Sequence, residues 1–259
     1  MDKPEMRRAL IAGVPVDLVG YKRALAICRD FLRGDRGRMI VTPNPEFAVR
    51  AARDERFAGL LKSADLAVCD GFGLALAGRL WGVKVPEVVT GVSLAVGLAW
   101  LCESEGRKLY LLGGEYPTAA EKSASYLKSN FPKLIIAGAE PGGLIRRDGE
   151  VWDQDPGLID RINDAAPDVL FVALGHGKQE DWIRSHLAQL PSVRVAIGIG
   201  GAFNYWSGHL RRPPSLVRRF HLEWLWRLVT EPRVRARRIY DAVIRFPILA
   251  LKKRLQPVK

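Results

Sequence analysis

Alternation of short apolar runs with longer stretches of helical periodicity constrains the fold of this chain more than any other feature. The runs are four to seven residues long, rich in leucine or β-branched residues, and show no clean in-out alternation. Strands buried on both faces of a parallel sheet have this pattern. Six strands are predicted, at Arg38–Thr42, Leu66–Asp70, Lys108–Leu112, Leu134–Ala137, Val169–Leu174 and Val193–Ile199.

Helical patterns lie between these runs. The principal ones are Glu46–Leu61, Val92–Ser104, Thr118–Asn130 and Glu180–Leu190. Strand and helix in alternation predict an α/β fold, in which helices flank a mostly parallel sheet. The start of the chain differs, because Ala9–Leu18, with Gly13-Val14-Pro15 at its centre, predicts a small β-hairpin.

Charge is distributed unevenly over the 259 residues. The net charge is +12, yet residues 208–259 carry 14 basic and three acidic residues, whereas residues 1–207 carry 26 and 25. A near-neutral body with a strongly basic tail indicates a polyanionic or anionic-surface partner. We therefore expect an α/β core over residues 1–207 and a basic, aromatic-rich helical appendage over residues 208–259.

The appendage has helical periodicity of its own. Val217, Phe220, Trp224 and Leu228 recur at helical spacing, and a second helix is expected over Arg235–Arg245, ended by Pro247. Aromatic and aliphatic residues interleaved with arginines suit a helix at a membrane interface. The same pattern suits a helical pair packed on the core with a solvated basic face, so both interpretations stay open here.

Cysteine usage and the N-terminus bear on the compartment. Cys28, Cys69 and Cys102 lie far apart and form no CxxC pair, which suits a reducing cytoplasm. The first 20 residues are too polar for a signal peptide, and no run reaches the roughly 18 uncharged apolar residues of a spanning helix. We expect a cytoplasmic protein that can lie on a membrane surface.

The ends of the predicted strands carry the candidate site, because ligands of open parallel sheets bind beyond the carboxyl ends of the strands. Glycines there allow close backbone approach, and the helix N-termini that follow favour phosphate. These ends read Thr42-Pro43-Asn44-Pro45-Glu46, Asp70-Gly71, Gly113-Gly114, Gly175-His176-Gly177-Lys178-Gln179-Glu180 and Gly198-Ile199-Gly200-Gly201. None of them completes GxGxxG with a following acidic residue, so a nicotinamide cofactor is not expected.

Asp70 is the candidate catalytic residue. Its carboxylate follows a strand, where it can act as a general base toward a hydroxyl nucleophile, although an Asp that caps the next helix fits the same position. Thr42 and Asn44 follow the neighbouring strand in a Thr-Pro-Asn-Pro frame. The prolines keep this loop extended, which displays both polar side chains, and a structural turn is the competing account.

Metal-ligand patterns are weak in this sequence. Asp153-Gln154-Asp155 matches a DxD motif superficially, but it falls in a stretch, Gly142–Gly157, that is expected to be a hydrated polar loop. The four histidines have no zinc spacing, and only His176 is a candidate for ligand contact. Cys69 is interpreted as a small core residue. No metal and no cofactor are expected.

Taken in order, the strand-end motifs resemble the WecG/TagA/CpsF family of bacterial glycosyltransferases (glycosyltransferase family 26). The matching motifs are Thr42-Pro43-Asn44-Pro45-Glu46, Ala64-Asp65-Leu66 leading to Asp70-Gly71, Leu111-Leu112-Gly113-Gly114, Gly175 with Lys178-Gln179-Glu180, Gly200-Gly201-Ala202-Phe203, and Glu223-Trp224-Leu225-Trp226-Arg227-Leu228 with Glu231-Pro232. The resemblance extends from the Gly13-Val14-Pro15-Val16-Asp17 hairpin to the arginine-rich tail.

This resemblance implies a metal-independent, inverting enzyme of Rossmann-like (GT-E) fold. Such an enzyme moves a sugar from a UDP-sugar to a polyprenyl-diphosphate-linked saccharide at the inner face of the cytoplasmic membrane, in surface or exopolysaccharide synthesis. It is often a homo-oligomer, and its C-terminal appendage contacts the anionic membrane and helps to close the site.

The resemblance also implies roles for individual residues. Asp70 matches the proposed base, Thr42 and Asn44 match polar pocket residues, and Gln179 matches a nucleotide-sugar contact. The full set expected to bind substrate is Thr42, Asn44, Gly71, Gly113, Gly114, His176, Gln179, Glu180, Gly200, Gly201 and Asn204. The set expected to meet diphosphate or lipid is Arg212, Arg227, Arg233 and Arg235.

Some positions depart from the family pattern. Gly177 stands where Pro is common, and Val88 stands where N-acetylmannosamine transferases often carry arginine. The donor sugar therefore stays open among N-acetylmannosamine, its uronate, glucose and glucuronate. Two rival classes are a nucleic-acid-binding Rossmann-like protein with a basic tail, and a catalytically silent sugar-nucleotide-binding homologue. The tail's tryptophans and leucines, which form hydrophobic faces, argue against nucleic acid as the partner.

Overall fold

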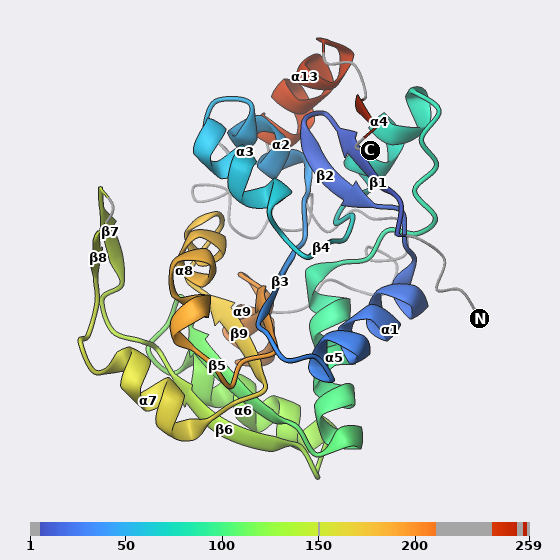
Figure 1. The fold of residues 1–259 in the computed structure, drawn as a ribbon. Coiled ribbons are helices and arrows are strands. Elements are labelled where there is room, and N and C mark those ends of the chain that lie inside the picture. The colour runs from blue at the N-terminus through green and yellow to red at the C-terminus, as the bar shows by residue number, and fades with distance from the viewer. Residues whose placement is uncertain (1–5, 150, 211–239, 253–255, 258–259) are drawn as a thin grey trace. The chain divides into compact units, whose positions relative to one another are not determined.

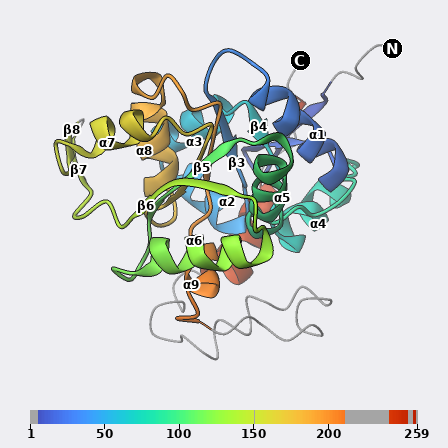
Figure 2. The same cartoon turned by 90° about the horizontal axis from the view of Figure 1, so that it is seen from below.

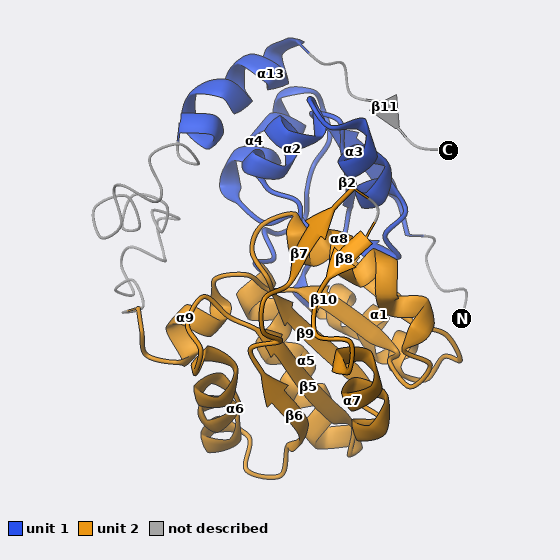
Figure 3. Ribbon diagram, turned by 90° about the vertical axis from the view of Figure 1, so that its left-hand side faces the viewer, with its two compact units in different colours: residues 1–21, 42–90, 212–259 blue, residues 22–41, 91–211 orange. Residues whose placement is uncertain are grey.

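The structure is a computed structural model, and it describes residues 6–149, 151–210, 240–252 and 256–257. The chain folds into two units, each assembled from separate stretches of sequence (Figure 3). The first unit comprises residues 1–21, 42–90 and 212–259, and the second comprises residues 22–41 and 91–211.

The second unit contains a parallel sheet, as the sequence predicts. Its strands lie in the order β3 (Arg38–Val41), β10 (Val195–Gly198), β9 (Val169–Ala173), β5 (Lys108–Gly113) and β6 (Ile135–Glu140). All four strand pairs in this order are parallel. Every residue of β9 and β10 is buried, which explains why these strands show no alternation in the sequence.

Helices cover both faces of this sheet and confirm the α/β class. Figures 2 and 3 show α6 on one face and α7 and α8 on the other. The helices that contribute to this unit are α1 (Tyr21–Leu32), α5 (Gly91–Glu105), α6 (Ala119–Asn130), α7 (Leu158–Ala165), α8 (Lys178–His186), the 3-10 turn η1 (Leu187–Gln189) and α9 (Ala202–Trp206).

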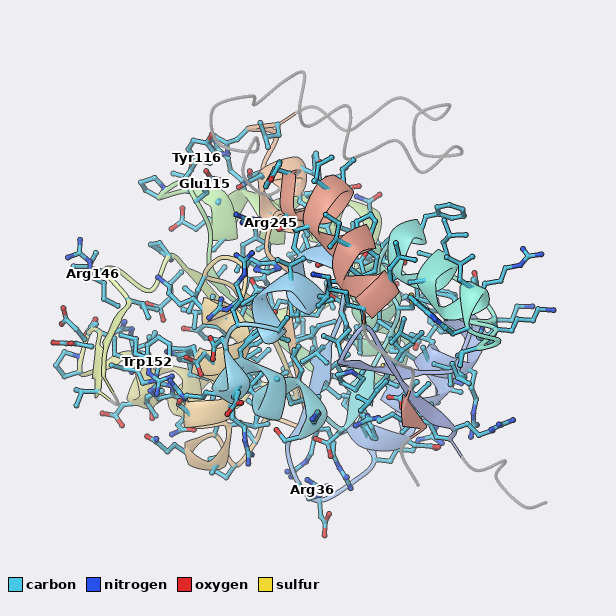
Figure 4. All side chains as sticks on the ribbon, turned by 90° about the horizontal axis from the view of Figure 1, so that it is seen from above. Arg36, Glu115, Tyr116, Arg146, Trp152 and Arg245 are labelled. Carbon is cyan, nitrogen blue, oxygen red and sulfur yellow. The ribbon has the colours of Figure 1, made fainter. Side chains whose placement is uncertain are left out.

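The stretch that the sequence presents as a hydrated loop, residues 142–157, is not one. It contains a β-hairpin, β7 (Arg146–Asp148) and β8 (Val151–Asp153), which bears Arg146 and Trp152 (Figure 4). Its contacts with α8 include an ion pair between Arg147 and Asp181 and a hydrogen bond from Trp182 Nε1 to Gln154 Oε1 (2.7 Å). Strands of three residues are too short for a hydrophobic period, so the sequence pattern concealed them.

The first unit begins with the predicted hairpin, β1 (Arg8–Ile11) and β2 (Val14–Asp17), which the structure confirms (Figure 1). Its two-residue turn places Ala12 at φ 51° and Gly13 at φ 90°. Two left-handed residues are the requirement of a turn that matches the twist of a hairpin. The C-terminal strand β11 (Gln256–Pro257) pairs with β1 in antiparallel orientation.

The single helix predicted over Glu46–Leu61 is wrong, because two helices occupy this stretch. They are α2 (Pro45–Ala51) and α3 (Glu55–Lys62). Asp54 starts the second helix, since its carboxylate accepts the Phe57 amide (2.9 Å) and thereby competes with a continuous helix. The short strand β4 (Leu66–Ala67) and the helix α4 (Phe72–Leu80) follow.

Pro247 does not end the C-terminal helix, contrary to the expectation from sequence. The π-helical turn η2 (Asp241–Arg245) runs directly into α13 (Phe246–Lys252), with Pro247 in its first turn. Proline is tolerated at that position because the wider preceding turn relaxes the demand for its missing amide hydrogen. Phe246 and Ala250 are buried, and this segment packs against α2 within the first unit.

Candidate functional site

The predicted site residues fall into two groups, one in each unit. Thr42, Asn44, Asp70 and Gly71 belong to the first unit. The second unit holds Gly113, Gly114, His176, Gln179, Glu180, Gly200, Gly201 and Asn204. The four candidate arginines of the appendage, Arg212, Arg227, Arg233 and Arg235, lie outside the described residues.

Asn44 starts helix α2. Its Oδ1 accepts the amide of Phe47 (3.0 Å), and Pro45 occupies the first helical turn, so both residues of the Asn-Pro pair have a local structural role. Thr42 is buried directly after β3, with 7% of its surface exposed. The structural account therefore holds for the Asn44 oxygen, and the amide nitrogen of Asn44 is the group that a ligand could use as a donor.

Asp70 and Gly71 are joined to the Asn44 loop through the backbone. The Asp70 amide donates to the carbonyl of Pro43 (2.8 Å), and Gly71 has φ 114°. A Cβ added at Gly71 would lie 3.3 Å from Pro45 Cδ and in a strained conformation, so glycine is the residue that this turn accepts. The structure thus brings Asn44, Asp70 and Gly71 together and leaves the Asp70 side chain partly exposed.

Cys69 is not a nucleophile at neutral pH. Burial, followed by the charge of Asp70, raises the pKa of the Cys69 thiol to about 12. The thiol is thus protonated at neutral pH, and only the thiolate is a strong nucleophile. This agrees with the interpretation of Cys69 as a core residue.

One neighbour of this loop was not expected from sequence. A Cβ built on Gly73 would lie 3.1 Å from Pro45 Cγ and 3.8 Å from the ring of Phe246, at the start of α13. Phe246 is 3% exposed and comes from a segment more than 170 residues further along the chain. Sequence patterning carries no signal for such a contact.

In the second unit, glycines bring neighbouring strand ends close together. A Cβ at Gly113 would lie 2.7 Å from the carbonyl oxygen of Ala173, and the Gly114 amide donates to the same oxygen (2.8 Å). Both glycines have positive φ, 100° and 121°. Their turn between β5 and α6 therefore depends on the missing side chains.

Gln179 and Glu180 form a buried network at the start of α8. Gln179 Oε1 accepts the Gly200 amide (3.0 Å), and its Nε2 donates to Glu180 Oε1 (2.8 Å). Glu180 Oε2 accepts the Gly177 amide (2.8 Å). The pair therefore holds the Gly175–Gly177 turn and the Gly198–Gly201 turn in register, which is a positioning role, and the substrate contact expected of both residues stays a prediction.

His176 and Lys178 flank this network in the turn between β9 and α8. His176 is half-buried, whereas Lys178 Nζ donates to the carbonyl of Ile145 (2.6 Å). Burial, and then the charge of Arg146, lowers the pKa of Lys178 from its ordinary value. A cationic group beside a helix N-terminus is an environment that favours a phosphate.

Asn204 pairs with a residue that the sequence did not single out. Its Nδ2 donates to Glu115 Oε2 (2.6 Å), and Tyr116 stacks on His209 with 4.2 Å between ring centroids. Glu115 and Tyr116 lie side by side in Figure 4. The sequence did contain a signal for Glu115 as a site residue, because it directly follows the Gly113-Gly114 strand end.

The two aspartates of the DxD motif have different structural roles. The Asp155 carboxylate accepts the Gly157 amide (2.9 Å) and forms an ion pair with Arg161 (2.9 Å), whereas Asp153 ends strand β8. Across the part of the chain that the structure describes, no three His, Cys, Asp or Glu residues are grouped so that they could hold a metal ion.

His186 links α8 to the β7–β8 hairpin. Its Nδ1 lies 2.9 Å from the carbonyl of Trp182, and its Nε2 lies 3.3 Å from Gln154 Nε2. A neutral ring satisfies both contacts, with Nδ1 as donor and Nε2 as acceptor. Burial lowers the pKa of His186 from its ordinary value of 6.5.

This environment gives an expected pH dependence. Below pH 6.5 the unfolded chain binds a proton at His186 that the native chain resists, so the free energy of unfolding falls as the pH falls. His186→Gln should make the slope between pH 7.5 and 5.5 shallower, by up to about 1.4 kcal/mol per pH unit. Urea unfolding at a series of pH values measures it, and an unchanged slope in the variant contradicts this role.

A parallel sheet whose carboxyl ends carry glycine turns and helix N-termini defines the class of Rossmann-like α/β proteins. Within that class, residues 9–259 match the family described as Glycosyl transferase WecG/TagA/CpsF. The chain belongs to this family, and it is a glycosyltransferase. The predicted class, a glycosyltransferase of this family, is confirmed.

Curated relatives agree with this assignment. A Bacillus spizizenii protein is 35% identical over 202 residues, which are 78% of this chain and 75% of the relative. A Bacillus subtilis protein is 31% identical over 76% of this chain and 73% of its own, and one from Staphylococcus aureus is 26% identical over 85% and 83%. All three are named N-acetylglucosaminyldiphosphoundecaprenol N-acetyl-beta-D-mannosaminyltransferase.

Proposed function

We propose that this enzyme transfers N-acetylmannosamine, with inversion, from its UDP derivative to a saccharide carried on a polyprenyl diphosphate. The names of the relatives support both the sugar and the lipid-linked acceptor. The single structural observation that carries the proposal is the turn in which Asp70 is tied to the Asn44–Pro45 loop. That turn presents a carboxylate at the end of β4, where it can receive a proton.

In the proposed mechanism Asp70 takes the proton of the acceptor hydroxyl. The oxygen attacks the anomeric carbon, the bond from that carbon to the diphosphate breaks, and UDP leaves with the electron pair. Charge grows on the departing diphosphate, and backbone amides at helix N-termini are suited to stabilise it.

The acceptor's lipid carrier fits a peripheral position at the inner face of the cytoplasmic membrane. Within the described ranges no helix is both long and apolar enough to cross a bilayer. The net charge of residues 208–259 is +11, from 14 basic and three acidic residues. Basic residues near an anionic leaflet contribute about 1 kcal/mol each, so a few of them would hold the protein there.

Donor identity is tested by thermal unfolding in the presence of different UDP-sugars. A ligand that binds only the native state stabilises it by about 2.7 kcal/mol when its concentration is 100 times its Kd. UDP-N-acetylmannosamine should raise the unfolding temperature more than UDP-glucose or UDP-glucuronate. A larger shift with one of the other two would reassign the sugar.

Transfer is expected to persist when divalent cations are removed. The prediction rests on the residues that could act as metal ligands. The Asp155 carboxylate already accepts the Gly157 amide and forms an ion pair with Arg161. Initial rates should agree within about twofold with and without EDTA, because helix N-termini and cationic side chains replace the metal at the diphosphate. Strict dependence on added Mn²⁺ or Mg²⁺ would overturn it and return Asp153 and Asp155 to consideration.

A further inference from the structure

Helix α4 presents large apolar side chains to the outside. Phe72, Leu76 and Leu80 recur at every fourth position, and their exposed fractions are 54%, 43% and 68%. Residues at this spacing share one face of a helix. The opposite face is the packed one, because Leu74, Ala77 and Gly78 are buried. An exposed apolar patch of this kind marks an interaction surface.

A second exposed apolar face occurs on the helical segment of η2 and α13. The outward residues are Tyr240, Ile244, Ile248 and Leu251, of which Leu251 is 77% exposed. Figures 1 and 4 show α13 (red) next to α4 (teal), and the Gly73–Phe246 approach joins their first turns. Both apolar faces therefore belong to neighbouring helices of the first unit.

Charge around these two faces selects the partner. Residues 71–86 contain two basic residues, Arg79 and Lys84, and no acidic residue. Residues 240–259 contain five basic residues and one acidic residue, Asp241, which forms an ion pair with Arg245. Apolar side chains bordered mainly by cations fit the interface of an anionic bilayer. A second copy of this chain fits less well, because it would bring the same positive charges against these.

We propose that the outward face of α4, defined as Phe72, Leu76 and Leu80, lies on an anionic lipid bilayer together with the outward face of η2–α13. The inference rests on the proposed function in one respect, since the acceptor is held in the membrane by its lipid. Gly71 alone separates Asp70 from the first residue of α4. Contact of α4 with lipid therefore keeps the turn that bears the base at the level of the headgroups, where the acceptor's diphosphate lies.

Vesicle flotation tests this surface directly. Full-length protein is mixed with vesicles of phosphatidylcholine and phosphatidylglycerol in equal parts, or of phosphatidylcholine alone. Leu76→Ser/Leu80→Ser should lower partition into the anionic vesicles by on the order of tenfold or more, because each leucine loses several buried carbon atoms. The matched control is Leu144→Ser/Val151→Ser, which changes two exposed aliphatic residues of the second unit, 60% and 71% exposed, and should float like wild type.

Two results overturn the proposal. One is flotation of the α4 variant at the wild-type level. The other is a wild-type oligomer in the absence of lipid that the α4 substitutions convert to monomers, which would assign the surface to a second copy. Light scattering reports this state.

A label at single positions supplies a measurement that does not depend on how well the double variant folds. The three native cysteines are buried, so Leu80→Cys and Leu251→Cys can be labelled selectively with an environment-sensitive fluorophore. Emission at both positions should increase on anionic vesicles and be quenched by spin-labelled lipid. Val151→Cys should show neither change. Equal responses at positions 80 and 151 contradict the proposal.

Activity on a water-soluble acceptor separates this inference from the proposed function. With a short-chain acceptor and no vesicles, Leu76→Ser/Leu80→Ser should turn over within about twofold of wild type. Loss of that turnover would place the outward face of α4 in the catalytic site and overturn the membrane role. Failure of wild type to use any such acceptor would refute the proposed function, whereas the flotation result would stand unaffected.

Discussion

Asp70→Asn is expected to lower the rate of sugar transfer by about 10²–10⁴-fold while donor binding and the fold are kept, because a positioned base contributes that much. The asparagine has the same shape, and the backbone bond from the residue 70 amide to Pro43 is unaffected by it. The change therefore removes the proton acceptor and keeps the backbone of the turn. Initial rates with saturating donor and acceptor measure the loss.

Asp65→Asn is the matched control for this variant. It makes the same acid-to-amide change at the other end of β4, in the same unit. Its rate should stay within about twofold of wild type, since that carboxylate has no proposed catalytic role. A loss of less than tenfold in Asp70→Asn would sink the assignment of Asp70 as the base.

The second large effect concerns stability. Asp17 is fully buried at the end of β2 and accepts two hydrogen bonds of 2.8 Å from the guanidinium of Arg8. It also accepts the amide of Ala67 in β4 (2.7 Å). The hydrogen bonds from Arg8 to Asp17 raise the pKa of Arg8. Burial opposes this shift, and the negative charge of Asp17 adds to it, so Arg8 stays charged.

Asp17→Asn should consequently lower the free energy of unfolding by about 3–5 kcal/mol, since it leaves a half-buried guanidinium without its counter-charge. The change should also loosen β4, which precedes the Asp70 turn. Asp241→Asn is the control, because its ion pair with Arg245 is more exposed and its loss is expected to cost much less. Urea unfolding compares the two, and equal losses would contradict the special role of Asp17.

Much of the fold follows from local patterns in the sequence. Buried strands such as β9 and β10 were predicted because their residues are apolar throughout, and the hairpin at Gly13 was predicted from its turn residues. The wrong predictions concern helix ends, where a local interaction or a local change of helix type decided where the helix stops. Asp54 divided the expected helix Glu46–Leu61, and a π-helical turn let the C-terminal helix continue through Pro247.

The candidate site was predictable in position and less so in detail. Strand ends identified Asp70, Asn44 and Gln179, because the topology of a parallel sheet places ligand contacts there. The sequence could not show that Gln179 and Glu180 turn inward to bond the Gly200 and Gly177 amides, or that Phe246 lies beside Gly73. Such contacts depend on tertiary packing, for which one sequence holds no periodic signal.

The central claim, that this glycosyltransferase builds a lipid-linked disaccharide, is tested most directly by a transfer assay. Wild-type protein is incubated with radiolabelled UDP-N-acetylmannosamine and N-acetylglucosamine carried on a prenyl diphosphate, with and without EDTA. The account predicts a labelled lipid-linked disaccharide of β configuration and one UDP released for each sugar transferred. Release of UDP without labelled lipid, or labelled product in equal amounts from Asp70→Asn, would contradict it.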